Sequence, residues 1–286
     1  MPSDTSKKVP LASIACRAAA VRAHESKRAD RLFDDPWAAL LAGQVEQKWS
    51  GHSSTNSNSR GSDPAIVIRT KFFDDFLLHA AAEYQIRQVV IVTTGMDTRA
   101  FRLAWPEGTR LFELDQPELL AQKEQLLSSA GASPTCWRQI LGIDLRDFYW
   151  ADALCQAGFD PLQRSVWLLE GLLYHLPESS ALHLINVITA LSAAESRLGF
   201  NIMNHDLLTS PLHRALIESL EKAGIPVTFT MDEPEVVLAE RGWSAIAVQN
   251  GEKDANFGRW PHPIAPRSVP EVPRSFLVTA TRMSDK

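Results

Sequence analysis

One stretch, residues 88–103 (QVVIVTTGMDTRAFRL), constrains the fold of this chain more than any other. Its apolar, β-branched run at 89–92 ends in a turn of small residues at 93–95, and a helix start follows at Asp97. Parallel sheets hold polar cofactors with this order of strand, tight loop and helix N-terminus. The small residues let the backbone come close, and the helix end offers free N–H groups. The stretch therefore predicts a ligand-binding loop at the edge of an α/β sheet.

A second apolar run, at 111–114, ends at Asp115. An acid about 20 residues after such a loop can accept hydrogen bonds from both hydroxyl groups of a ribose. The loop and Asp115 together predict a nucleoside-containing cofactor, but they do not indicate which one.

The rest of the chain alternates strands with helices. We expect strands at 89–93, 110–114, 136–141, 165–169 and 197–203, with helices between them. Two late strands, at 243–249 and 275–281, have only a loop between them, which favours an antiparallel pair. The pattern predicts a doubly wound, mostly parallel, seven-stranded sheet of Rossmann-like α/β type.

Composition narrows the class of partner. The net charge is −5, and no basic run is interleaved with aromatic residues, which argues against a nucleic-acid partner. No segment approaches ~20 uninterrupted apolar residues, and the N-terminus has no secretory apolar region, so we expect no membrane partner. Three cysteines lie far apart without CxxC spacing, as in a cytoplasmic protein with reduced thiols.

Two arginines before the central stretch are candidates for the site. Arg22, in a predicted helix at 13–27, is either solvated or reaches into the cofactor site. Arg69 faces the apolar side of a predicted helix at 63–84, and a core-facing arginine needs an anion or a cage of hydrogen bonds. Arg69 therefore either binds a carboxylate of a ligand or forms an internal ion pair.

Residues 49–64 are mostly Ser, Thr, Asn and Gly. Such a segment is either a disordered surface loop or a mobile lid over a nearby site. We leave both interpretations open.

Polar groups follow four successive predicted strands, at Gly95, Asp115, Asp144 and Glu170. Taken singly, each acid is most often a helix cap or a solvated loop residue. Because the carboxyl ends of parallel strands meet at one edge of the sheet, the four together favour one site.

Each group suits one part of a nucleoside cofactor. Asp144 can accept from the amine of an adenine, and the neighbouring Leu145 can pack on its ring. Glu170 suits an ammonium group, and Arg69 suits a carboxylate. An ammonium with a carboxylate is an amino-acid tail, so the set points to S-adenosyl-L-methionine rather than to a nicotinamide dinucleotide.

Several blocks spread over nearly the whole chain carry a family resemblance. They are RAHESKRADRLFDDPWAALLAG, TTGMDTRAFRL, LFELDQP, GIDLRD and LLEGLLYHLP, with later GW and FLVTA segments. The chain resembles the leucine carboxyl methyltransferase family of class I S-adenosylmethionine-dependent methyltransferases, especially its bacterial small-molecule O-methyltransferase branch.

The resemblance implies roles for most of the cofactor site. Arg69 would bind the methionine carboxylate, Asp115 the ribose, Asp144 and Leu145 the adenine, and Glu170 would face the methionine end. Arg22 would be a further contact to the carboxylate. The resemblance also implies one compact unit, with a helical cap and lid at 1–64 and a methyltransferase domain at 65–286. Insertions near 205–235 and 251–273 would cover the substrate.

The chain departs from the family pattern in the central loop. The family usually has Gly-Ala-Gly where this chain has Thr93-Thr94-Gly95. A Cβ at Thr93 restricts close backbone approach and disfavours positive φ. Thr93 therefore either weakens cofactor binding or adds a contact through its hydroxyl group.

We expect the reaction to be O-methylation of a carboxyl or phenolic hydroxyl group of a small molecule in secondary metabolism. A carboxylate acceptor needs no general base, whereas a phenol, with a pKa of ~10, gains from one. Tyr174, His175 and His205 follow predicted strands and are the candidates for that base. No HxxxH or HExxH spacing occurs, so we predict no metal.

Two other functions stay open at this point. A nicotinamide-dependent oxidoreductase would need a fuller G-x-G-x-x-G pattern than TTGMDT. A non-catalytic or regulatory protein that keeps the methyltransferase fold is the second alternative, and Thr93 is the feature that favours it.

Overall fold

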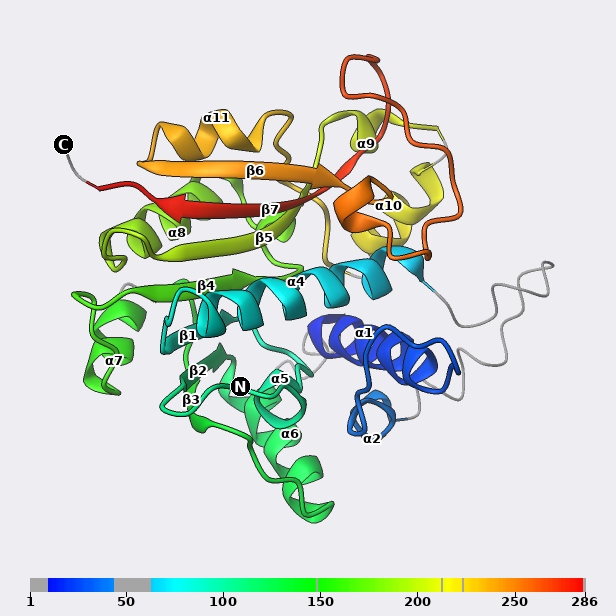
Figure 1. Ribbon diagram of the computed structural model, residues 1–286. Coiled ribbons are helices and arrows are strands. Elements are labelled where there is room, and N and C mark those ends of the chain that lie inside the picture. Colours follow the sequence, from blue (N-terminus) through cyan, green and yellow to red (C-terminus); the bar gives the residue numbers. More distant parts are fainter. Residues whose placement is uncertain (1–9, 44–62, 148, 212, 223, 285–286) are drawn as a thin grey trace, which may run out of the picture.

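The computed structural model describes residues 10–43, 63–147, 149–211, 213–222 and 224–284. One seven-stranded sheet forms the centre of the molecule, in the order β3-β2-β1-β4-β5-β7-β6 (Figure 1). The strands are β1 Gln88–Val92, β2 Arg110–Asp115, β3 Trp137–Gly142, β4 Ser165–Leu169, β5 Arg197–Met203, β6 Trp243–Gln249 and β7 Ser275–Arg282. The predicted seven-stranded, doubly wound sheet is confirmed.

The direction of winding reverses between β1 and β4. From β1 the chain moves outward through β2 to β3, and it then returns to place β4 on the other side of β1. All of these pairings are parallel. Ligands of open α/β sheets bind at such a switch point, outside the carboxyl ends of the strands. The central loop, which follows β1, lies at this position.

The predicted antiparallel pair at the end is also confirmed, but its placement in the sheet was not predicted. β7 lies between β5 and β6 and runs antiparallel to both. Phe276, Leu277 and Val278 are consecutive buried residues of β7, so this strand needs cover on both faces. β6 alternates buried with more exposed residues and therefore suits the sheet edge.

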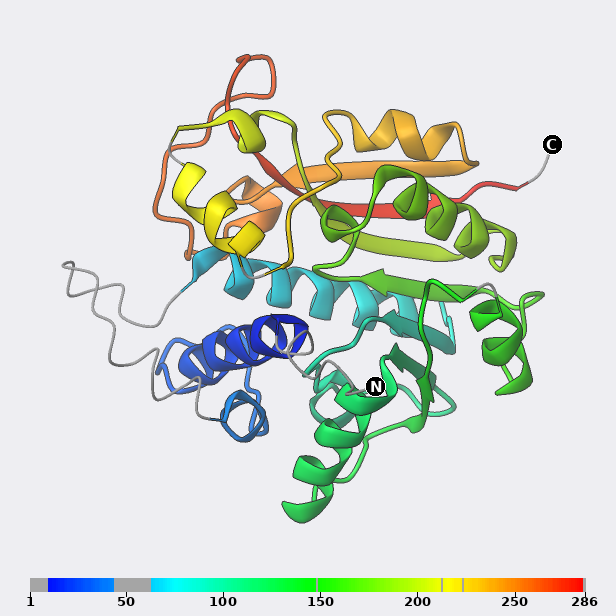
Figure 2. The same cartoon turned by 180° about the vertical axis from the view of Figure 1, so that it is seen from behind.

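Helices cover both faces of the sheet (Figures 1 and 2). One face carries α1 Pro10–Ser26, α2 Ala38–Ala42, α4 Pro64–Ala82, α5 Arg99–Arg102 and α6 Pro117–Ser129. The other face carries α7 Trp150–Gln156, α8 Glu178–Ala190 and α11 Pro234–Ala239. Alternate residues of the strands supply the two cores. Val90 and Val92 of β1 pack toward the α8 side, and Val89 and Ile91 pack toward the α4 side.

Each of the remaining short helices comes after a strand. They are η2 Leu173–His175 after β4, α9 Asp206–Thr209 and α10 Arg214–Lys222 after β5, and η3 Lys253–Ala255 after β6. The sequence did not predict η2, α9 or η3, because helices of three or four residues are too short for a hydrophobic period to show. The helix expected after Asp97 is real, but it spans only four residues.

The first part of the chain packs against the rest. α1 contacts both α2 and α4, and Arg259, from the loop after η3, donates to Glu25 of α1 at 2.8 Å. Residues 49–62 of the proposed lid lie outside the described residues, and the division at residue 64 stays a prediction. Within the described part of the chain, no helix is long and apolar enough to cross a membrane.

Candidate active site at the β1/β4 switch point

The loop after β1 adopts the backbone conformation that glycine would favour, although it begins with threonine. Thr93 has φ 56° and Gly95 has φ 51°, both in the left-handed region. The Thr93 hydroxyl donates to the Val92 carbonyl at 2.6 Å. A β-branched residue is strained at such a φ, so the loop keeps the shape that the family pattern requires at a cost in local stability.

Asp115 holds this loop from the end of β2. Its Oδ2 accepts from the Gly95 N–H at 2.6 Å, and its Oδ1 accepts from the Gln116 N–H at 2.7 Å. The residue is 8% exposed, and burial raises the pKa of its carboxyl group against the opposing effect of these two hydrogen bonds. The carboxylate that the sequence singled out is thus fixed in place, with one accepted bond on each oxygen.

Glu170 and Arg69, two further predicted site residues, form an ion pair. Nε of Arg69 donates to Oε1 of Glu170 at 2.7 Å, although 101 residues separate them in the chain. Nη1 of Arg99 lies 2.8 Å from Oε2 of the same glutamate. Burial opposes ionisation of Glu170, but the charges of Arg99 and Arg69 outweigh it and lower its pKa. The sequence had left Arg69 between a ligand contact and an internal ion pair; the structure contains the ion pair.

This pair is one part of a larger buried network. Arg99 donates to Asp74 at 2.7 Å and also bonds Asp97, while Arg102 bonds Asp74 through both terminal nitrogens. Burial alone would raise the pKa of Asp97, but the charges of Arg99 and Lys123 outweigh it and lower that pKa to about 2. The charges of the network therefore favour the ionised forms of Asp97 and Glu170 directly behind the loop.

Arg22 joins the network from α1. Its Nε donates to Asp35 at 2.8 Å, and its Nη2 donates to the carbonyl of Met96, within the loop, at 2.5 Å. Asp35 also accepts from the Thr98 hydroxyl at 2.6 Å. Arg22 thus reaches the loop backbone, as the sequence allowed.

The sequence analysis missed five members of the network: Asp35, Asp74, Asp97, Arg99 and Arg102. A usable signal was present in α5, where two arginines three residues apart flank buried Ala100 and Phe101. Charged residues are almost never fully buried unless they are paired, so this spacing could have indicated buried partners. Apart from the local Asp97–Arg99 pair, the contacts of Arg99 and Arg102 join residues 25 to 71 positions apart, from Asp74–Arg99 to Arg99–Glu170, and no local pattern contains them.

Asp144 and Leu145 follow β3 beside the site. The Ile143 N–H donates to the Asp115 carbonyl at 2.8 Å, which joins this loop to the end of β2. Asp144 pairs with Arg146 at 2.5 Å, and the hydrogen bond from Arg146 lowers the pKa of Asp144. Leu145 is half-buried against the core. Their predicted role toward an adenine stays a prediction.

Of the three proposed base residues, Tyr174 lies nearest the network. A Cβ built on Gly171 would lie 3.4 Å from the Tyr174 hydroxyl oxygen and 3.7 Å from Nη1 of Arg69, so both groups border the same point. Nδ1 of His175 lies 3.0 Å from the Pro226 carbonyl, and burial lowers the pKa of that imidazole. His205 is exposed, and its backbone N–H donates to Asp232.

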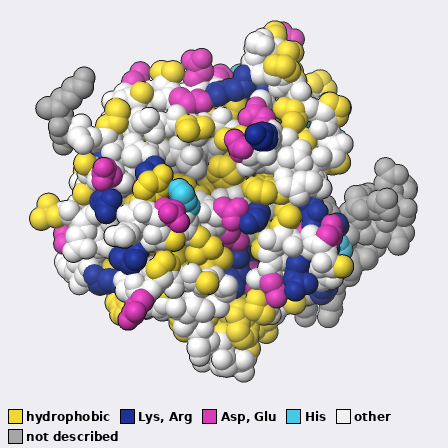
Figure 3. Space-filling view, viewed as in Figure 1, with side chains coloured by type: hydrophobic (Ala, Val, Ile, Leu, Met, Phe, Trp, Pro, Cys, Tyr) yellow, Lys and Arg dark blue, Asp and Glu magenta, His cyan; other side chains and the backbone are white. Residues whose placement is uncertain are grey.

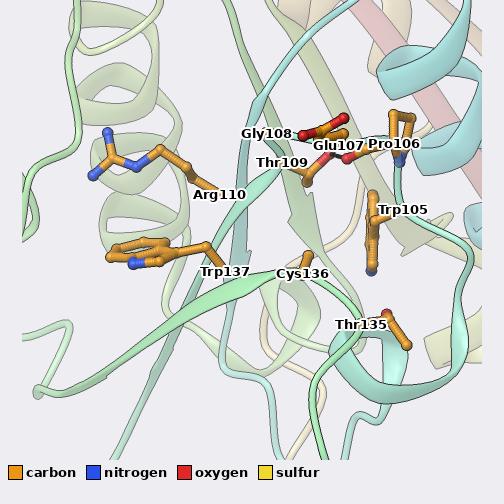
Figure 4. A pocket seen from close by; sticks show the side chains of 9 residues that line it. All are labelled: Trp105, Pro106, Glu107, Gly108, Thr109, Arg110, Thr135, Cys136 and Trp137. Carbon is orange, nitrogen blue, oxygen red and sulfur yellow. Dashed lines mark hydrogen bonds between the residues drawn. The ribbon is translucent and has the colours of Figure 1, made fainter.

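Two cavities lie at the opposite edge of the sheet, where the strands begin. One, of about 470 Å³, is lined by residues 105–110 and 135–137. In Figure 4, Arg110 and Trp137 lie side by side and point away from Trp105. The other, of about 210 Å³, adjoins the start of β5. Among the residues described, no group of three or more His, Cys, Asp and Glu side chains could hold a metal ion.

The order of the strands and the acids at the switch point define a class I methyltransferase. A profile of the leucine carboxyl methyltransferase family matches residues 15–189. The chain belongs to the leucine carboxyl methyltransferase family and is an enzyme of the methyltransferase class, not a nicotinamide oxidoreductase.

Curated relatives agree with this assignment. A protein of Saccharopolyspora erythraea, named as a candidate S-adenosyl-L-methionine-dependent methyltransferase, is 37% identical over 271 residues, which cover 92% of this chain and 93% of the relative. A protein of Mycolicibacterium gilvum with the same name is 40% identical over 230 residues, or 77% of this chain and 76% of the relative.

Solved structures share the fold at low identity. The crystal structure of a candidate methyltransferase from Thermobifida fusca has a TM-score of 0.61 at 14% identity and covers 95% of both chains. A DUF574 family protein from Streptomyces avermitilis has a TM-score of 0.57 at 14% identity, with coverage of 95% of this chain and 99% of the other. At these identities the likeness shows the fold alone.

The strained loop predicts that Thr93→Gly stabilises the protein. Glycine adopts positive φ without steric strain, so we expect the free energy of unfolding to rise by about 0.5–1 kcal/mol in urea titrations. Thr209→Gly, at an exposed helical position, is the control and should destabilise the protein. A loss of stability in Thr93→Gly as large as in Thr209→Gly would contradict the strain argument.

The lowered pKa of Asp97 predicts how stability depends on pH. An ordinary aspartate has a pKa of ~3.9 in the unfolded chain, against about 2 in the folded protein. Its stabilisation is therefore complete above pH ~4 and is lost as the pH falls toward about 2. The stability difference between wild type and Asp97→Asn, measured by urea unfolding, should be largest near neutral pH and shrink below pH ~4.

The exposed Asp152→Asn variant provides the control for that experiment. Because the Asp152 side chain is exposed, this variant should differ from the wild type at neutral pH by less than Asp97→Asn does. A constant difference between wild type and Asp97→Asn from pH ~6 to ~2 would refute the role given to Asp97.

Proposed function

We propose that this protein is an S-adenosyl-L-methionine-dependent O-methyltransferase that acts on a carboxyl group or a phenolic hydroxyl group of a small molecule, within secondary metabolism. The observation that carries the proposal is the convergence of Asp115, Arg69 and Glu170 at the β1/β4 switch point of a leucine carboxyl methyltransferase family member. Asp115 can bind the two hydroxyl groups of a ribose, Arg69 a carboxylate and Glu170 an ammonium group. S-adenosyl-L-methionine carries all three of these groups.

The free hydrogen-bonding capacity of these residues fits the cofactor. Among the contacts of the described residues, Arg69 uses only its Nε toward a carboxylate, so its terminal nitrogens remain for a methionine carboxylate. Oε2 of Glu170 is buried 2.8 Å from Nη1 of Arg99, and because a carboxylate oxygen has two lone pairs it could also accept from an ammonium group. The Thr94 hydroxyl, in the loop itself, is buried without a hydrogen-bond partner in the described structure. Buried polar groups are normally satisfied, so this hydroxyl supports a ligand that binds at the loop.

The residues of the chain would orient the cofactor and the acceptor rather than activate them chemically. When bound, S-adenosyl-L-methionine supplies an electrophilic methyl group on a sulfonium. Asp115 would bind the ribose, Asp144 and Leu145 the adenine, and Arg69 with Glu170 the amino-acid end. Arg22 would hold the loop through Met96 rather than bind the cofactor directly. Holding both reactants in line accounts for much of the rate of such a displacement.

The cap and the insertions would complete the site. Ala15 of α1 lies over the loop, since a Cβ on Gly95 would be 3.0 Å from the Ala15 Cβ. Figures 1 and 2 both show α9 and α10 at the same end of the sheet as α1 and the start of α4. We propose that residues 205–235 and 251–273 form the wall of the acceptor pocket and that residues 1–64 close over the cofactor.

The proposed acceptor is a small molecule rather than a nucleic acid. The net charge is −5. Figure 3 shows basic and acidic side chains in small mixed groups on the face it presents, rather than one continuous basic surface. Binding of a phosphate backbone depends on such a basic surface.

Tyr174 is the residue that we propose to contact the acceptor. Its hydroxyl group and Arg69 border the same point near Gly171, next to the proposed methionine end. In its phenolate form it would accept the proton of a phenolic acceptor, and in its neutral form it would donate to and position a carboxylate acceptor. His205 is the second candidate base, from the end of β5.

Calorimetric titration with S-adenosylhomocysteine tests the cofactor site. The wild type should bind it, and Asp115→Ala should weaken binding by about 1–3 kcal/mol, or roughly 5- to 150-fold, through loss of charged hydrogen bonds. Because Asp115 also holds Gly95, Asp115→Asn and the thermal midpoint of each variant should be measured in parallel. Asp152→Ala, on α7, is the matched control. Absence of wild-type binding at high micromolar concentration would overturn the proposal.

Tyr174→Phe separates the two classes of acceptor. With a phenolic acceptor found in a panel, we expect kcat to fall by about 10²-fold or more and the alkaline side of the pH–rate profile to change. With a carboxylate acceptor, which needs no base, the loss should be below tenfold. The same loss in His205→Phe and none in Tyr174→Phe would move the role to His205.

A further inference from the structure

A second cavity lies far from the candidate active site, at the edge of the sheet where β5 begins. Its volume is about 210 Å³. It is lined by Phe76, His79, Ala80 and Tyr84 from α4 or the residues just after it, by Arg197 of β5, and by Ser244, Ile246, Thr279, Ala280 and Thr281 of β6 and β7. We call it the Arg197 cavity. Because β5 begins at Arg197 and ends near the switch point, this cavity and the proposed methyl-transfer site occupy opposite edges of the sheet.

The strand register brings the polar side chains of the cavity onto one face. Arg197 pairs with Thr281, which in turn pairs with Ser244, so the three form a row across β5, β7 and β6. Thr279 and Ile246 form the next row on the same face, two residues along each strand. Ile246 is 67% exposed, so this part of the sheet is open to solvent beyond α4.

The guanidinium group of Arg197 is held in place but is not neutralised. It lies 3.8 Å from the centre of the Tyr84 ring, and its Nη1 donates to the Thr281 hydroxyl at 2.5 Å. Its Nε is buried and has no hydrogen-bond acceptor in the described structure, and no described carboxylate lies within ion-pair distance of it.

The lining of the cavity has a single electrostatic character. Its polar side chains are one guanidinium, one imidazole and four hydroxyl groups, including that of Tyr84, all of which can donate hydrogen bonds, and no acid is among these described residues. His79 packs edge-on against Tyr84, with 5.0 Å between ring centres. Phe76, Ala80 and Ile246 add apolar surface. A negatively charged group with an apolar body matches this combination.

We infer that the Arg197 cavity is a binding site for a small organic anion, such as an aromatic carboxylate or phosphate. The anionic group would accept from Arg197 and the neighbouring hydroxyl groups, and the ring would pack between Tyr84, Phe76 and Ile246. A guanidinium in this geometry binds planar oxyanions in preference to single charges. The volume is below the ~300–1,000 Å³ of sites for larger ligands, so the ligand is a single-ring molecule.

Benzoate and phenyl phosphate are suitable probes, and ligand-observed NMR titration of the full-length protein is a suitable measurement. Benzylammonium has the same ring with the opposite charge and serves as the charge control. We expect saturable binding of one or both anions below about 10 mM and none of benzylammonium. A stronger response to benzoate would identify a carboxylate site, and a stronger response to phenyl phosphate a phosphate site.

Two pairs of variants locate the binding. Arg197→Met should weaken anion binding at least tenfold, whereas Arg164→Met, which alters an exposed arginine at the start of β4, should leave it within twofold. Ile246→Glu places a negative charge at an exposed position of the cavity without disturbing the core, and it should also weaken binding at least tenfold. Ile246→Gln is its uncharged control; it loses the apolar contact with the ring but adds no charge, so it should weaken binding clearly less than Ile246→Glu does.

The inference is overturned if neither anion binds the wild type, if benzylammonium binds equally well, or if Ile246→Glu and Ile246→Gln bind equally. It does not depend on the proposed methyl transfer. Asp115→Ala should bind both anions as the wild type does, so failure of one proposal is distinguishable from failure of the other.

Discussion

A buried network of arginines and carboxylates holds the candidate active site together. Four arginines meet four carboxylates within it: Arg22, Arg69, Arg99 and Arg102 with Asp35, Asp74, Asp97 and Glu170. Their formal charges balance. Removal of one member would leave an uncompensated buried charge, which typically costs about 3–5 kcal/mol. The members come from α1, α4, α5, the central loop and the end of β4, so the network joins the cap to the sheet at the switch point.

The network also explains how a strained loop persists. Thr93 has positive φ, and a local conformation of this kind survives only when its surroundings determine it. Here Arg22 binds the Met96 carbonyl and Asp115 binds the Gly95 N–H, so the loop is held from both sides. Thr93, which departs from the family pattern, is therefore held at positive φ by contacts on both sides of the loop. Preorganised polar groups lose little freedom when a ligand binds, which favours affinity.

The two proposed sites illustrate different consequences of the same sheet. At the carboxyl ends, parallel strands bring acids from distant parts of the sequence to one edge, and the arginines neutralise them. At the opposite edge, the antiparallel β7 leaves hydroxyl side chains open beside Arg197, and no acid is among the described residues that line its cavity. An arginine with its carboxylate stabilises the fold, whereas one without a carboxylate remains available to a ligand.

The amino-acid sequence by itself determined the alternation of strands and helices, the position of the loop and the acids that follow successive strands. These features are local, since periods of two and 3.6 residues and residues at strand ends can be seen in short windows. Their joint position at one edge followed from the rule for parallel sheets, which selected Asp115 and Glu170 as site residues. Arg69 was selected because it faces the apolar side of its predicted helix.

Only the tertiary structure decided which charges pair. Arg69 meets Glu170 across 101 residues, and Asp35 meets Thr98 across 63, through contacts that no sequence window contains. The insertion of β7 between β5 and β6 was decided in the same way. Its consecutive buried residues need cover on both faces, and that cover exists only once the other six strands and their helices have formed.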